Sequence, residues 1–152
     1  MIQGVMIKQL TTHVDERGFF REVVRRTDEI LSEGFGQLSL SHMYQGVIKA
    51  WHIHRKQVDW WYLANGVIKV ALYDTRRDSS TYRELMEVML GDNQPAQLLK
   101  IPTGVAHGCK CISGPADLFY ITSDVYNPQD EGRIPYNDPE INYDWIKGPE
   151  IK

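Results

Sequence analysis

The sequence has 152 residues, a length that suits one domain with a core of its own. It is 42% hydrophobic and carries a formal net charge of -3, so it lacks the excess of basic residues that is typical of nucleic-acid-binding proteins. No run approaches the roughly 18 apolar residues of a membrane span, and the start of the chain does not resemble a signal peptide; we therefore expect neither a nucleic-acid nor a membrane partner.

Short apolar runs separated by turn residues follow one another along the chain. In the run at 67–74, Ile68, Val70 and Leu72 alternate with other residues, as on one face of a sheet. The triplets ANG and SGP indicate turns. Many short strands at near-regular spacing predict an all-β barrel or sandwich. The predicted strands cover residues 4–10, 19–24, 37–44, 46–54, 59–66, 67–74, 84–90, 96–102, 106–112 and 117–124.

One segment near the N-terminus, TDEILSEGFG at 27–36, predicts a short helix that Thr27 caps and Gly34 ends. After about residue 127 the chain becomes acidic and proline-rich but keeps its aromatic residues. We expect an ordered tail laid over the barrel and anchored by Tyr136, Tyr143 and Trp145, because a disordered tail would have fewer aromatics. Without an internal repeat or a linker, residues 1–152 are predicted to form a single domain.

Two adjacent tryptophans and two cysteines lie within the predicted strands. Neighbouring strand residues point to opposite faces, so we expect one of Trp60 and Trp61 in the core and the other toward a pocket. Cys109 and Cys111 lie two apart in one strand, which is unfavourable for a disulfide between them, and we interpret them as small residues of the barrel interior. A reduced, cytoplasmic protein is the simplest interpretation.

Three histidines form the main candidate site. His52 and His54 lie two apart in one predicted strand and therefore share a face, while His107 belongs to another strand. Their surroundings resemble the two motifs of the cupin superfamily, and this resemblance implies a double-stranded β-helix, or jelly-roll barrel. The first motif comprises Gly46, His52, His54, Asp59 and Gly66, and the second comprises Pro102, Gly104 and His107.

The histidine pattern allows two chemical interpretations. If a metal is present, we expect His52, His54, Asp59 and His107 to hold it, since three imidazoles and a carboxylate suit several transition metals. The alternative is a barrel without metal or other cofactor, in which the histidines transfer protons or only pack.

Three further segments resemble the dTDP-4-dehydrorhamnose 3,5-epimerase family of cupins. They are DERGFFRE at 15–22, QLSLSHMYQGVIKAWH at 37–52, and LFYITSDVYNPQDEGRIPYNDPEINYDW at 118–145, and the resemblance covers about residues 3 to 146. It implies a homodimeric isomerase that needs no cofactor and acts on a nucleotide-linked 4-keto-6-deoxy sugar. A base removes a proton next to the ketone, and an acid returns one on the other face. The implied cellular role is deoxysugar synthesis for polysaccharide.

The resemblance also implies roles for individual residues. His52 matches the base and Tyr120 the acid, and His54 is a possible second acid/base group. Lys49 stands where an arginine usually meets the diphosphate. The remaining matches are substrate-binding residues: Gln37, Asp59, His107 and Tyr126 in the site itself, and Arg17, Phe20 and Glu22, which reach into the neighbouring subunit.

Two departures from the family leave alternatives open. Asp59 stands where the family has a lysine that stabilises the enolate, and the sequence ends at Lys152 before the family's segment whose aspartate pairs with the catalytic histidine. We expect the partner of His52 to be Asp59 or Asp74, or to be missing. The stretch WHIHRKQ also resembles the sugar 3,4-ketoisomerases, which use two histidines. A ketoisomerase, a metal-dependent cupin enzyme and a non-catalytic sugar-nucleotide-binding protein are therefore the alternatives.

Overall fold

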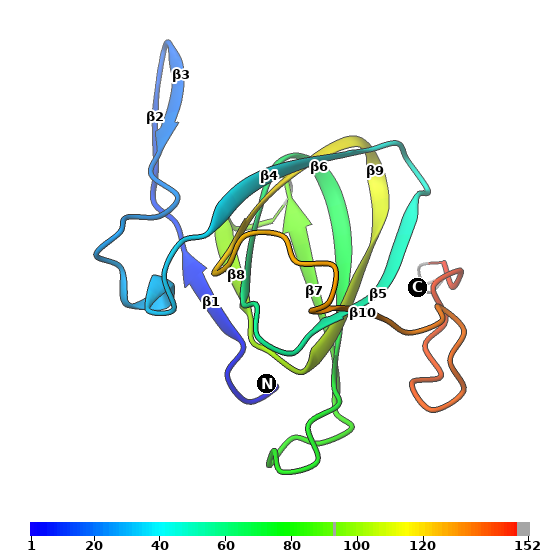
Figure 1. Cartoon of the computed structure of the whole chain (residues 1–152). Helices are drawn as coiled ribbons and strands as arrows, with labels where there is room; N and C mark the ends of the chain where they lie inside the picture. The colour runs from blue at the N-terminus through cyan, green and yellow to red at the C-terminus, as the bar shows by residue number, and fades with distance from the viewer. Residues whose placement is uncertain (93, 149–152) are drawn as a thin grey trace.

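The computed structural model describes residues 1–92 and 94–148, and nearly all of its regular structure is antiparallel β-strand closed into a barrel (Figure 1). The predicted all-β jelly-roll class is confirmed. The strands are β1 (Met6–Gln9), β2 (Thr12–Asp15), β3 (Gly18–Arg21), β4 (Gln37–Met43), β5 (Ile48–His54), β6 (Asp59–Asp74), β7 (Leu85–Gly91), β8 (Gln97–Ile101), β9 (Val105–Thr122) and β10 (Glu131–Arg133).

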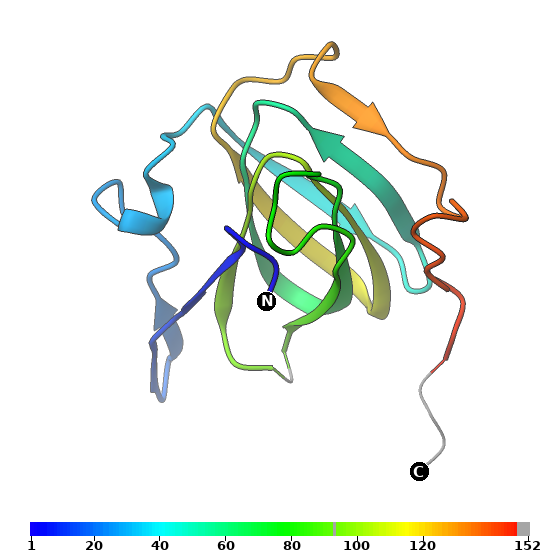
Figure 2. The ribbon, with the colours of Figure 1, turned by 90° about the horizontal axis from the view of Figure 1, so that it is seen from below.

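Two long strands, β6 and β9, organise the barrel. They pair with each other from Asp59 opposite Thr122 to Asp74 opposite Val105. Toward the start of β6 the pair is extended by β8 on one side and β4 on the other, and toward its end by β7 and β5. Figure 2 shows β4, β5 and β9 running side by side across the barrel. The two long strands therefore belong to both halves of the barrel.

The predicted turns at ANG and SGP are wrong, because each lies inside a long strand. Runs 59–66 and 67–74 together form β6, and runs 106–112 and 117–124 together form β9. The pairing register shifts around Asn65 and Val67, and Gly66 has a φ of 84°. A Cβ on Gly66 would lie 2.8 Å from the carbonyl oxygens of Ser113 and Pro115. Glycine thus makes a bulge that bends the strand pair without reversing the chain.

The predicted N-terminal helix is reduced to one 3₁₀ turn, η1 (Glu29–Leu31). Its N-cap residue is Asp28 rather than Thr27, and the Asp28 carboxylate accepts hydrogen bonds from Lys8 Nζ (2.6 Å) and the Arg25 N–H (2.8 Å). Ile30 is buried, and its carbonyl accepts a 2.6 Å hydrogen bond from the Trp60 indole. Packing against the barrel therefore stops the segment after one turn.

Strands β2 and β3 form a separate hairpin that projects away from the barrel (Figure 1). β2 was not among the predicted strands. The hairpin exposes apolar side chains, with Val14 76%, Phe19 62% and Phe20 67% exposed. The hairpin thus leaves apolar surface that the described chain does not cover.

The C-terminal tail is ordered over the barrel, as predicted, but one of its three anchors is wrong. Trp145 is buried and packs on Trp51 with a ring-centroid distance of 4.8 Å, and Tyr143 lies 4.6 Å from Trp145. Tyr136, in contrast, is 57% exposed. Before these anchors the tail contributes β10, which pairs with β5 (Figure 2). Within residues 1–92 and 94–148, no helix has the length and apolar character that a membrane crossing requires.

We expect Trp145→Ala to lower the free energy of unfolding by about 3 to 5 kcal/mol, because a buried indole and its packing on Trp51 are lost. Urea denaturation followed by circular dichroism measures this change. The matched control, Tyr136→Ala, removes an exposed aromatic of the same tail and should change stability by less than about 0.5 kcal/mol. Equal effects of the two substitutions would contradict the assignment of Trp145 as the anchor.

Candidate active site

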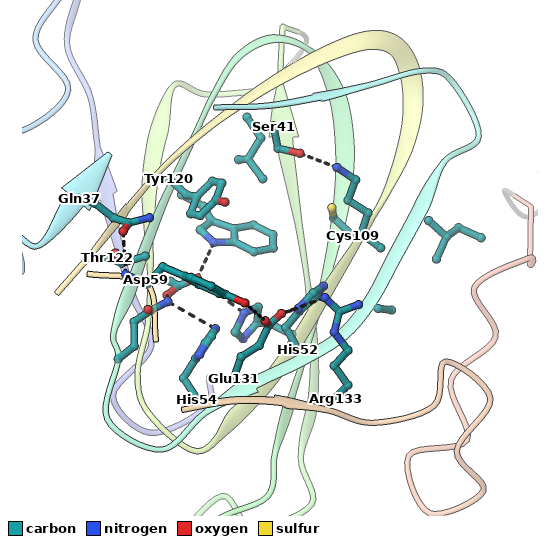
Figure 3. A pocket seen from close by; sticks show the side chains of 18 residues that line it. Gln37, Ser41, His52, His54, Asp59, Cys109, Tyr120, Thr122, Glu131 and Arg133 are labelled. Atoms are coloured by element: carbon teal, nitrogen blue, oxygen red, sulfur yellow. Dashed lines mark hydrogen bonds and ion pairs between the residues drawn. The ribbon is translucent and has the colours of Figure 1, made fainter. Parts of the chain in front are cut away.

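A cavity of about 660 Å³ opens into the barrel, between the inner faces of β4, β5, β6 and β9 and under β10 (Figure 3). The structure brings eight predicted site residues together around it and leaves three outside it. Arg17, Phe20 and Glu22 are exposed on or just after the β2–β3 hairpin. The eight residues that line the cavity are Gln37, Lys49, His52, His54, Asp59, His107, Tyr120 and Tyr126.

The partner of His52 is neither Asp59 nor Asp74, the two predicted candidates, but Glu131 on β10. His52 Nδ1 lies 3.2 Å from Glu131 Oε1. Burial lowers the pKa of the His52 imidazole, and Glu131 opposes that shift by favouring the charged form. Asp74 lies at the far end of β6, where Arg76, Ser79 and Thr81 bind it. The sequence gives no sign of this pairing, because Glu131 lies 79 residues after His52, in the acidic tail.

Asp59 is buried and faces His107 instead. Its Oδ2 lies 3.7 Å from His107 Nε2 and accepts a 3.2 Å hydrogen bond from the Trp61 indole, while Oδ1 accepts one of 2.7 Å from Gln57 Nε2. The other ring nitrogen of His107, Nδ1, lies 3.0 Å from the Val105 carbonyl oxygen. Burial lowers the pKa of His107 well below its usual value, although the Asp59 charge opposes this. The Asp59 carboxylate is therefore held by neighbours on its own strand and on the β5–β6 turn.

The predicted metal ligands gather only in part. Ligand atoms of His54, Asp59 and His107 lie within 4.8 Å of one another, and among the described residues this group does not include His52. Two imidazoles and one carboxylate are a donor set that transition metals accept. In this arrangement His52 instead has a carboxylate partner of its own, in Glu131. That the protein needs no cofactor stays a prediction.

A cation and an amide also line the cavity, in two separate places. Lys49 Nζ donates a 2.6 Å hydrogen bond to Ser41 Oγ, and Gln37 Oε1 accepts one of 2.7 Å from the Tyr126 N–H. Tyr120 lies on β9, opposite Trp61 of β6, and its ring lies in the cavity between Gln37 and Ser41 (Figure 3). The cavity thus carries a cation beside Ser41 and, in another place, an amide on β4 opposite Thr122.

The tryptophans and cysteines behave as predicted. Trp61 lines the cavity, whereas Trp60 faces the opposite side of β6 and is fully buried against η1. Both cysteines are buried and carry free thiols, and burial raises the pKa of Cys109 to about 12. They are therefore interior packing residues.

Fold and site together define a cupin barrel whose cavity holds acid/base side chains. The chain belongs to the dTDP-4-dehydrorhamnose 3,5-epimerase family, whose sequence model matches residues 1–152. It is 48% identical over 148 residues to the spore coat polysaccharide biosynthesis protein SpsL of Bacillus subtilis strain 168, covering 95% of this chain and 97% of SpsL. It is 35% identical over 148 residues to the probable low-salt glycan biosynthesis epimerase Agl13 of Haloferax volcanii, covering 95% of this chain and 94% of Agl13.

Solved structures agree with this assignment. A dTDP sugar isomerase from Desulfovibrio desulfuricans G20 superposes with a TM-score of 0.90 at 27% identity, over 97% of this chain and 94% of that one. The dTDP-6-deoxy-D-glucose-3,5-epimerase RmlC of Legionella pneumophila, in complex with dTDP-4-keto-L-rhamnose, superposes with a TM-score of 0.84 at 30% identity, over 97% of this chain and 81% of that one. The jelly-roll fold and the isomerase class are therefore shared with characterised relatives.

The buried His107 makes stability depend on pH. Its pKa is lowered in the folded state, so between about pH 4 and 6.5 the unfolded chain binds more protons than the folded chain. The free energy of unfolding therefore falls as the pH drops from about 6.5 toward about 4. One such group contributes at most about 1.4 kcal/mol per pH unit. When the free energy of unfolding is measured against pH, His107→Gln should give a shallower slope in this range. The control His13→Gln, which changes an exposed histidine, should keep the wild-type slope. An unchanged slope in His107→Gln would contradict His107 as the source of this pH dependence.

Proposed function

We propose that this protein epimerises a nucleotide-linked 4-keto-6-deoxy sugar by proton transfer at a carbon next to the ketone. The observation that supports this most is that His52 and Tyr120 line one cavity from different strands, with a carboxylate beside His52. The family assignment supports the same reaction class. RmlC of Legionella pneumophila binds dTDP-4-keto-L-rhamnose, which supports a substrate of that kind here.

In the proposed reaction His52 is the base. With Nδ1–H donated to Glu131, the lone pair of Nε2 is free to remove the proton from carbon 3 or 5, and burial keeps the imidazole neutral. The electrons move onto the 4-keto oxygen and form an enolate. Tyr120 then donates its hydroxyl proton to the other face of the carbon, which inverts it and restores the ketone. The phenolate recovers a proton from solvent, and the His52 imidazolium releases the proton that it took to solvent.

Asp59 does not prevent this reaction, although it stands where the family has a lysine. Gln57 and Trp61 already donate hydrogen bonds to its two oxygens, and it faces His107. Its charge is therefore compensated locally and is not free to oppose the enolate.

The two-histidine alternative is supported by one observation at His54. This ring also lines the cavity, and its buried Nδ1 has no hydrogen-bond partner among the described residues. His52 and His54 on one face of β5 are the pair that a 3,4-ketoisomerase would use. The two reactions differ in which carbon carries the ketone in the product.

The test is incubation with dTDP-4-keto-6-deoxyglucose in deuterated water, followed by NMR of the sugar. We expect deuterium at carbon 3, carbon 5 or both, with inversion; a ketone moved to carbon 3 would instead indicate ketoisomerase activity. His52→Asn should slow the exchange by roughly 100- to 10,000-fold, because the base is lost. Tyr120→Phe should retain exchange but lose inversion, since His52 can return a deuteron only on the face from which it took the proton.

The matched controls are His42→Asn and Tyr82→Phe, which change residues outside the cavity lining. Both should exchange and invert at the wild-type rate. Full exchange in His52→Asn would contradict its role as the base, and absence of exchange from dTDP-, CDP- and GDP-linked 4-keto sugars would favour a binding protein.

We further propose that the working unit is a homodimer in which the β2–β3 hairpin completes the partner's site. The exposed Phe19 and Phe20 and the position of Arg17 outside its own cavity support this arrangement. Arg17 is tied to Asp15 within the hairpin, and its side chain is 84% exposed, so its guanidinium is presented outward.

Mixing two inactive variants tests the exchange of hairpins between subunits. Arg17→Ala lacks the nucleotide contact and His52→Asn lacks the base, so each homodimer should be slow at low substrate concentration. If Arg17 serves the neighbouring subunit, each mixed dimer has one intact site, and random mixing should restore about a quarter of wild-type activity. If Arg17 serves its own subunit, mixing restores nothing. Sedimentation analysis of both variants checks that they still dimerise.

A further inference from the structure

We propose that Glu131 is the positioning residue of the catalytic base: it fixes the tautomer of His52 and stabilises the imidazolium formed when His52 takes the substrate's proton. This inference rests on the proposed function, in which His52 is the base. The sequence offered only Asp59 and Asp74 as partners of His52. Glu131 takes that role instead, from a short strand of the C-terminal segment.

The pairing of β10 with β5 places Glu131 beside His52. Arg133 lies opposite His52 and Glu131 lies opposite His54, so Glu131 is the diagonal neighbour of His52 on the same face. The contact between His52 Nδ1 and Glu131 Oε1 is 3.2 Å, and both side chains are largely buried, at 28% and 18% exposed. The geometry makes the carboxylate the acceptor of the Nδ1 proton, which leaves Nε2 as the basic nitrogen.

The backbone on both sides of Glu131 is held in place. Before it, the Asp130 carboxylate accepts hydrogen bonds from the backbone N–H groups of Arg55, Lys56 and Gln57, at 3.0 to 3.2 Å. After it, Trp51 and Ile134 exchange two backbone hydrogen bonds of 3.2 Å. These contacts bind the segment to β5 and to the β5–β6 turn, so the carboxylate is positioned before any substrate arrives.

A glycine allows β10 to come this close. A Cβ on Gly132 would lie 2.8 Å from Ile53 Cγ2 and 3.3 Å from the Ile53 carbonyl oxygen. Any side chain at this position would therefore require β10 or Ile53 to shift, and a shift of β10 would lengthen the contact between Glu131 and His52.

The Glu131 carboxylate is also kept ionised. Partial burial opposes ionisation, but the Arg133 guanidinium and His52 hold the pKa of Glu131 below its usual value. Arg133 Nη2 donates a 3.0 Å hydrogen bond to Glu131 Oε1, the oxygen that faces His52. The Tyr126 hydroxyl lies 3.4 Å from the other oxygen. An anion fixed in this way lowers the free energy of the transient imidazolium without taking the proton itself.

The experiment combines a spectroscopic readout with a kinetic one. Nitrogen-15 NMR of the imidazoles, with His52→Asn to assign the signal, reports the tautomer and pKa of His52 without any substrate. In Glu131→Gln we expect a lower His52 pKa, because burial still disfavours the cation and the opposing anion is gone. We also expect a mixed tautomer, since the glutamine amide can either accept or donate a hydrogen bond.

The same variant should slow deuterium exchange from the 4-keto sugar by roughly 10- to 100-fold. The acid limb of its pH profile should move to lower pH, in step with the His52 pKa, while its plateau falls because the base is weaker. Glu131→Asp keeps the charge but is one methylene shorter, so its His52 pKa should lie between those of the wild type and Glu131→Gln. The control Glu140→Gln removes a half-exposed carboxylate of the same tail that pairs with Arg83, and it should leave both readouts unchanged.

A His52 that keeps its tautomer and pKa in Glu131→Gln would overturn the proposal, even if the protein is an epimerase. If the NMR changes appear but no 4-keto sugar exchanges deuterium, the proposed function fails while the coupling of Glu131 to His52 stands. Slow exchange in Glu131→Gln with an unchanged His52 signal would assign Glu131 another role in the reaction and would likewise reject positioning.

Discussion

The antiparallel pairing of β6 with β9 along their full length is the constraint on which the rest of this structure depends. Two strands of this length cannot stay flat, and the bulge at Gly66 bends the pair so that both halves of the barrel share it. Ile68, Val70 and Leu72 are fully buried between the halves, and Ala71 is fully buried on the opposite face. The remaining barrel strands then pair with one or the other half. Because Trp61, His107 and Tyr120 all lie on these two strands, the same pairing that builds the core also sets the shape of the cavity.

The site itself is assembled by adding short segments to that framework. β5 contributes His52 and His54, and β10 crosses beside it from the C-terminal segment with Glu131. An aromatic cluster, in which Trp51 packs on Trp145 and Tyr143, holds the following part of the tail against the barrel. A residue far along the sequence is therefore fixed beside His52 by packing among residues that do not line the cavity. Elements that look peripheral in the sequence thus determine the chemistry of the cavity.

Burial and charge compensation differ between two histidine–carboxylate pairs of the cavity, His107 with Asp59 and His52 with Glu131. His107 and Asp59 are both deeply buried and lie 3.7 Å apart, and both Asp59 oxygens have other donors. His52 and Glu131 are partly open to the cavity and in hydrogen-bond contact. Desolvation favours the neutral imidazole at both sites, but only at His52 does a directly bonded carboxylate stand ready to stabilise the charged form. His107 is thus suited to packing and polarity inside the barrel, whereas His52 is suited to gaining and losing a proton.

The sequence by itself determined the all-β class, the positions of most strands other than β2 and β10, the shared face of His52 and His54, and the family, because these follow from period-two patterns and from motifs of adjacent residues. It failed where distant segments decide the outcome. The ANG and SGP triplets look like hairpin turns locally, yet pairing between β6 and β9 makes them part of continuous strands. The segment at 27–36 has helical signals, yet packing of Ile30 against Trp60 leaves a single 3₁₀ turn. Tertiary structure alone decided that Glu131, and not Asp59 or Asp74, meets His52, because hydrogen-bond partners 79 residues apart in the chain are set by strand pairing and leave no local signal in the sequence.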